Sequence, residues 1–146
     1  MRLFGHPVHA MLVHFPSALL PADLVFSLLS FFYHEPLLNY AGYYCMIGGV
    51  VTGFFALITG FIDLTSIPST KKKAISSAFI HGGINGTVIL VYSVLAYKAW
   101  QTYPEIPSVA TNLIIIKAIL IFTLFAGNFF GGRLIYHFRI GINEKS

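Results

Sequence analysis

Four long apolar runs dominate the chain, and short polar segments separate them. The runs cover about residues 10–33, 38–64, 77–100 and 109–135. Each exceeds the ~20 residues that an α-helix needs to cross ~30 Å of hydrocarbon. Because lipid offers backbone groups no hydrogen bonds, helices are the expected form of these runs. The pattern predicts an all-α integral membrane four-helix bundle, running up-down-up-down, as a single domain over residues 1–146.

Composition supports a lipid environment and narrows the function. The 146 residues are 56% hydrophobic and 10% charged, whereas a soluble domain carries about 25% charged residues. The net charge of +4 comes mostly from loops and tails, so it reports orientation in a bilayer and does not indicate nucleic acid. No serine or cysteine nucleophile is paired with a nearby base, and no phosphate-binding loop occurs. A hydrolase is therefore not expected.

Basic residues favour one face of the predicted bundle. The opposite loops offer only Lys98, which Glu35 and Glu105 offset. By the positive-inside rule, both termini are expected in the cytoplasm. The basic residues shared by the termini and the middle loop are Arg2, Lys71, Lys72, Lys73, Arg139 and Lys145.

Five of the six histidines should gather near the same face, because odd-numbered spans begin where even-numbered spans end. Asp63, at the end of the second span, joins them. Imidazoles and a carboxylate at similar depth suit a metal ion or a haem iron. The five histidines are His6, His9, His14, His81 and His137.

The best-matched transmembrane pair is His14 with His81, each about one turn inside its span. Two neutral imidazoles on facing helices can ligate one haem iron from opposite sides, which predicts a b-type haem with an electron-transfer role. No Cys-x-x-Cys-His occurs, so covalent c-type haem is excluded. Other residues expected around the macrocycle are Gly82, Asn85, Gly86 and Arg133.

An alternative reading is the binding or transport of a transition metal ion such as zinc, copper or iron. The spacing of the ligands matches no closed zinc signature. A third reading keeps the outer histidines, above all His9 and His137, at the lipid headgroups without a cofactor. The candidate metal ligands are His6, His9, His14, Asp63 and His81.

Small residues recur at four-residue spacing in three spans. Such spacing lets helix backbones approach closely. Plain helix contact is the simplest reading, while the same faces could admit a flat cofactor, a second copy of the chain or a redox partner. A structural subunit without cofactor therefore remains an alternative. The pairs are Gly49 and Gly53, Gly82 and Gly86, and Gly127 and Gly131.

Two charged residues fall inside the predicted spans at similar depth. Asp23 lies near the middle of the first span and Lys117 about nine residues into the fourth. An isolated charge in hydrocarbon costs at least a few kcal/mol, so each residue needs a partner. We expect Asp23 and Lys117 to face each other, either as an ion pair that fixes helix order or as part of a proton or ion relay.

Several segments are similar to those of a known family. The chain contains GHPVHAMLVHFPSALLPADLVFSLL, then GFIDL, His81, and GGRLIYHFRIGI. These segments resemble the small prokaryotic membrane proteins called domain of unknown function 2231. The resemblance implies four helices in a prokaryotic plasma membrane and no particular activity. Its similarity to membrane b-type cytochromes is an analogy of fold alone.

The resemblance also marks individual positions and one departure. Ala10 stands where the family often has proline, which loosens the entry to the first helix. The positions that match the family pattern are His6, His9, His14, Asp23, Asp63, His81, Gly131 and Gly132.

Overall fold

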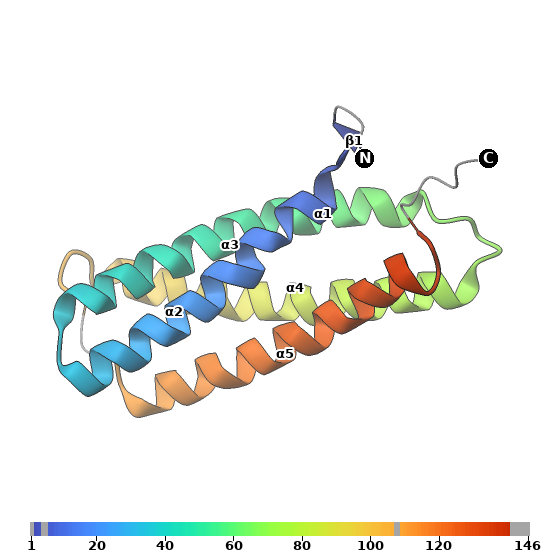
Figure 1. Cartoon of the computed structure of the whole chain (residues 1–146). Helices are drawn as coiled ribbons and strands as arrows, with labels where there is room; N and C mark the ends of the chain where they lie inside the picture. Colours follow the sequence, from blue (N-terminus) through green and yellow to red (C-terminus); the bar gives the residue numbers. More distant parts are fainter. Residues whose placement is uncertain (1, 4–5, 107–108, 141–146) are drawn as a thin grey trace.

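Four long helices form an elongated bundle in the computed structural model (Figure 1). The structure describes residues 2–3, 6–106 and 109–140, with side chains from residue 8 onward. A two-residue antiparallel pairing of β1 (Arg2–Leu3) and β2 (His6–Pro7) precedes the bundle. The helices are α1 (Val8–Leu12), α2 (His14–Tyr33), α3 (Pro36–Thr65), α4 (Lys72–Gln101) and α5 (Thr111–Tyr136).

The predicted all-α membrane bundle is confirmed. Four candidate membrane spans lie in the described part of the chain, and α1 and α2 together make the first, Val8–Tyr33. The main difference from the prediction is at α4, which begins at Lys72 rather than near Ser77. The apolar pattern marks only the part of a helix within hydrocarbon, whereas backbone hydrogen bonds extend the helix into the polar headgroups.

The first span is interrupted at Val13, between α1 and α2. Pro16 explains the break, since proline has no N–H for the carbonyl four residues earlier and its ring crowds that carbonyl. Hydrogen bonds from Val13 N to His9 O (3.0 Å) and from Ser17 N to Val13 O (3.2 Å) carry the helix across the interruption. His9 therefore lies in the short helix α1, which is separate from α2.

Local sequence signals also explain the turn between α2 and α3. His34 ends α2 in the left-handed conformation, with φ of 55°. Glu35 caps α3 by accepting a hydrogen bond from Leu37 N (3.3 Å), and Pro36 occupies the first helical position. A side-chain acceptor followed by proline is a favoured helix start. The turn therefore joins α2 and α3 as an antiparallel hairpin.

The bundle consists of two helical hairpins, α1–α3 and α4–α5. The closest associations are between α2 and α3 and between α4 and α5, and the α2–α5 seam is slighter. Leu20, Val88 and Tyr92 are fully buried at the centre. Large apolar side chains such as Phe32, Phe61 and Phe122 are at least 68% exposed on the outside. In a bilayer these outer side chains face lipid.

Candidate functional site: a histidine pair inside the bundle

Two histidine rings from different hairpins meet inside the bundle. The ring centres of His9 in α1 and His81 in α4 lie 6.1 Å apart, with their planes at 81°. Both side chains are half-buried. His81 lies nine residues after the start of α4, which is roughly 14 Å along the helix at 1.5 Å per residue. The pair is therefore well inside the bundle rather than at its mouth.

Each ring is fixed by a backbone carbonyl of the neighbouring helix in its own hairpin. His9 Nδ1 lies 2.9 Å from Ala56 O, and His81 Nδ1 lies 2.8 Å from Gly127 O. A carbonyl oxygen only accepts hydrogen bonds, so Nδ1 carries the proton in both rings. The lone pair is then on Nε2 in both rings, which is the tautomer of an imidazole that binds a metal through Nε2.

A glycine lies beneath each ring and makes room for it. A Cβ atom on Gly60 would stand 2.8 Å from His9 Cε1, and one on Gly131 would stand 2.7 Å from His81 Cε1. Such short approaches would force the ring to move. Any side chain at either glycine would thus displace a histidine.

The two hairpins repeat one arrangement. The hydrogen bond from histidine to carbonyl spans 47 residues in the first hairpin and 46 in the second. In both hairpins the glycine follows the acceptor residue by four positions. Both hairpins also run in the same direction, as in the parallel repeats of some membrane proteins. Sequence reasoning missed this correspondence, although the spacing of His9, Ala56 and Gly60 against His81, Gly127 and Gly131 carries it.

The expected pairing of His14 with His81 is corrected by this geometry. His14 is exposed at the first position of α2, while His9 lies beside His81. Five residues separate His9 from His14, which turns the side chain by about 140° on a helix. Only one of the two histidines can face the interior, and it is His9.

The other predicted metal ligands are scattered. Asp63 is half-buried and interacts electrostatically with His9. His137 is exposed just after α5, with its ring centre 4.7 Å from that of Phe138. The side chain of His6 lies outside the described ones. Within the described part of the chain, no three His, Cys, Asp or Glu residues are grouped so that they could hold a metal ion.

A line of polar side chains leads from His81 across the bundle. Asn85 Nδ2 donates to Asn128 Oδ1 (3.2 Å) and lies 3.1 Å from His81 Nδ1, which is a contact and not a hydrogen bond while Nδ1–H donates to Gly127 O. Asn128 Nδ2 in turn donates to Ser17 Oγ (3.0 Å). Asn85 Oδ1 is buried and has no hydrogen-bond partner among the described residues. Asn85 therefore borders the histidine pair, as expected, and connects it to both α5 and α2.

The remaining residues expected around a macrocycle lie on the same side of the bundle but are less enclosed. A Cβ on Gly82 would meet nothing within 4 Å, and one on Gly86 would lie 3.7 Å from Leu57 Cδ2. Arg133 is exposed in the last turn of α5, beyond the histidine pair. Other glycines at four-residue spacing contact side chains of their own bundle: Gly49 meets Leu20, and Gly53 meets Ile89.

The expected pairing of Asp23 and Lys117 is present. Lys117 Nζ donates to Asp23 Oδ1 (2.7 Å) and to Ser27 Oγ (2.8 Å). The side chains are 0% exposed for Asp23 and 5% for Lys117. Asp23 Oδ2 and the hydroxyl of Tyr92 are buried without a hydrogen-bond partner among the described residues. The pair joins α2 to α5, so it links the two hairpins.

Four membrane-spanning helices in two matched hairpins, with a histidine pair between them, define an integral membrane bundle protein with a polar interior. The family model for predicted membrane proteins of domain of unknown function 2231 matches residues 5–144. The chain belongs to this family. No curated protein and no solved structure matches it.

Proposed function

We propose that the chain is a membrane protein that binds b-type haem and transfers electrons, with His9 and His81 as the axial ligands. The observation that carries this proposal is the pair of inward imidazoles whose Nδ1 atoms both bond to backbone carbonyls. Metal-binding histidines almost always donate their other ring N–H in this way, which fixes the tautomer and the ring orientation. Bundle cores are a common location for such cofactors.

The number of ligands favours haem over a bare ion. The porphyrin fills the equatorial positions of its iron, so the protein supplies axial ligands only. A bare zinc site normally takes three or four protein ligands, and the described side chains offer no such group. The two imidazoles that the structure brings together, with ring centres 6.1 Å apart, meet the smaller number of ligands that haem needs.

The chain's own contribution is positioning. The carbonyls of Ala56 and Gly127 hold the two rings, and Gly60 and Gly131 leave space for them. Bound haem would supply reversible one-electron exchange. Because each ligand comes from a different hairpin, the cofactor would also bridge the two halves of the bundle and stabilise their association.

An absorption spectrum of the detergent-purified protein tests the proposal. We expect a Soret band in the wild type after growth with a haem precursor, and its loss in His9→Ala and in His81→Ala. His14→Ala is the matched control, because His14 is exposed, and it should keep the band. A wild type without a Soret band refutes haem binding, and a band that depends on His14 but not on His9 refutes this ligand assignment.

A second candidate is a transition metal ion held by His9 and His81, toward which Asp63 would have to move, because the described side chains do not group the three residues as they stand. Asp63 interacts electrostatically with His9, and a carboxylate with two imidazoles suits zinc, copper or iron. Metal analysis of purified protein and of Asp63→Asn separates the two candidates. Bound metal that is lost in Asp63→Asn, without a Soret band in the wild type, would favour the ion.

We further infer a prokaryotic inner-membrane location with both termini in the cytoplasm. Lys71 just before α4, Lys72 and Lys73 in its first turn, and Arg139 after α5 lie at one end of the bundle, and the cytoplasmic ends of membrane helices are enriched in such residues. A second copy of the chain or a redox partner would dock against the outer faces of the helices. A reporter fused to the C-terminus that is active only in the periplasm should be silent, and activity there would refute the orientation.

A further inference from the structure

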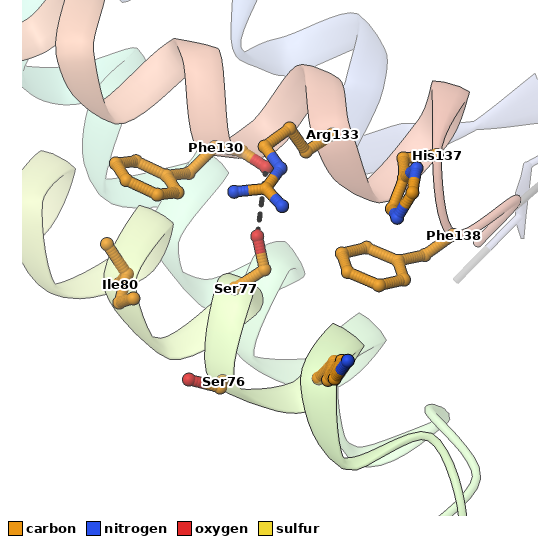
Figure 2. A pocket seen from close by; sticks show the side chains of 8 residues that line it. Ser76, Ser77, Ile80, Phe130, Arg133, His137 and Phe138 are labelled. Atoms are coloured by element: carbon orange, nitrogen blue, oxygen red, sulfur yellow. Dashed lines mark hydrogen bonds between the residues drawn. The ribbon is translucent and has the colours of Figure 1, made fainter.

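A cavity of about 280 Å³ opens between the start of α4 and the end of α5. Figure 2 shows its side chains, with Ser77 and Ile80 on α4 facing Phe130 and Arg133 on α5. The cavity lies at the end of the bundle that carries the basic loop, outward from the histidine pair. It therefore sits where hydrocarbon gives way to lipid headgroups.

Three of the residues that line the cavity are basic. Lys73 from α4, Arg133 from α5 and His137 just beyond α5 all line it, and none of the lining residues is acidic. The guanidinium of Arg133 and the ring of His137 are drawn on the same side of the cavity in Figure 2. A guanidinium presents N–H donors in a planar fork that matches the oxygens of phosphate. The grouping therefore favours an anion, with phosphate the best match.

Helix geometry adds to this preference. Lys73, Ser76 and Ser77 belong to the first two turns of α4, which contains no acidic residue in its first turn. The first N–H groups of a helix lack partners within it and carry partial positive charge; in α4 these are the groups before Ala74, because Ala74 N and Ile75 N donate to Lys71 O. Ser77 Oγ donates to Phe130 O (3.5 Å) and so closes the floor of the cavity, while Ser76 is exposed.

Three of the residues that line the cavity are apolar. Ile80, Phe130 and Phe138 line it, and Ile80 is 42% exposed. A free inorganic anion would leave this apolar wall uncovered. A phospholipid has both parts, a phosphate at this depth and an acyl chain that continues along the helices.

We propose that this cavity binds the headgroup phosphate of an anionic phospholipid, held by Lys73, Arg133 and His137. The acyl chain of that lipid lies against Ile80 and Phe130. This site is independent of the proposed haem function, because none of its residues belongs to the histidine pair. Basic pockets between membrane helices on the cytoplasmic side are suited to anionic headgroups.

Native mass spectrometry of the full-length protein in detergent, titrated with phosphatidylglycerol, tests the site. Each basic residue near an anionic headgroup contributes about a factor of five in affinity. The variant Lys73→Gln with Arg133→Gln should therefore bind about 25-fold more weakly. The matched control is Lys71→Gln with Lys72→Gln, which removes the same charge from the same face without touching the cavity. It should change binding by less than about twofold.

Two further measurements show whether the bound phosphate belongs to a lipid or is free inorganic phosphate. Phosphatidylcholine should bind far more weakly than phosphatidylglycerol, and millimolar inorganic phosphate should not displace the lipid. Equal losses in both double variants, or full displacement by inorganic phosphate, would overturn the proposal. Lys73 and Arg133 are exposed, so the variants should keep the wild-type helical circular dichroism. The single variant Arg133→Gln removes only one charge and should bind phosphatidylglycerol about fivefold more weakly, which gives a second test.

Discussion

The buried ion pair between Asp23 and Lys117 allows the sharpest test of what holds the two hairpins together. Its atoms lie 2.7 Å apart with almost no exposure, which gives an attraction of about 6 kcal/mol at an effective dielectric constant of about 20. Much of that attraction offsets the cost of removing two charges from water. The informative quantity is therefore the loss when only one partner is removed, which is about 3–5 kcal/mol for buried pairs.

We expect Lys117→Met to lower the free energy of unfolding by about 3–5 kcal/mol, because Asp23 would stay buried without its cation. Asp23→Asn should cost a similar amount, since Lys117 would then be the unpaired charge. The double variant should cost only about 1–2 kcal/mol, as neither charge remains. The two single losses together then exceed the loss in the double variant by at least about 4 kcal/mol, which is the coupling energy.

Equilibrium unfolding in mixed micelles, as a rising fraction of denaturing detergent replaces the mild one, measures these values by helical circular dichroism. Lys98→Met is the matched control, because Lys98 is exposed on α4 and such surface changes fall within about 0.5 kcal/mol. The reasoning is refuted if Lys117→Met costs no more than Lys98→Met, or if the two single losses simply add in the double variant.

Two further predictions concern single substitutions inside the bundle, at Gly131 and at Tyr92. Gly131→Ala should displace the ring of His81, whose Cε1 would lie 2.7 Å from the new Cβ, so it should cost about 1–3 kcal/mol by overpacking and shift or abolish the Soret band. Gly132→Ala, with nothing within 4 Å, should leave the spectrum unchanged and raise the free energy of unfolding by up to about 1 kcal/mol, because alanine favours a helix more than glycine does. Tyr92→Phe removes a buried hydroxyl without a described partner, so its free energy of unfolding should stay within about 0.5 kcal/mol of wild type or rise, and a loss above about 2 kcal/mol would reveal an essential partner.

The helices and the ion pair could be predicted because both depend on the number of residues in an apolar run and on the constant rise of a helix per residue. A run of apolar residues long enough to cross hydrocarbon has few alternatives to a helix. The constant rise per residue then fixes depth, so Asp23 and Lys117 could be matched across two spans from their positions alone. The expectation that the two side chains face each other followed from the free-energy cost of exposing either charge to lipid.

The partner of His81 could not be predicted in the same way. Choosing between His9 and His14 requires the rotation of the first span, and the interruption at Val13 sets that rotation. Depth was also misjudged, because α4 starts at Lys72, before its apolar run begins. His81 is therefore deeper in the bundle than its place in the hydropathy pattern indicated, at the level of Ala56 and Gly127 rather than at the mouth.

The polar contacts between the two hairpins connect the position of the buried ion pair with that of the histidine pair. Helices in lipid gain little from apolar burial against each other, so close packing and polar contacts decide how they align. Polar contacts that cross between the hairpins include Asp23 with Lys117, Ser17 with Asn128, and His9 with His81. A slip of α5 along α2 by one turn, about 5.4 Å, would break the first two. Because Gly127 on α5 holds His81, the same slip would separate His81 from His9. The ion pair thus sets the alignment that keeps the two imidazoles beside each other.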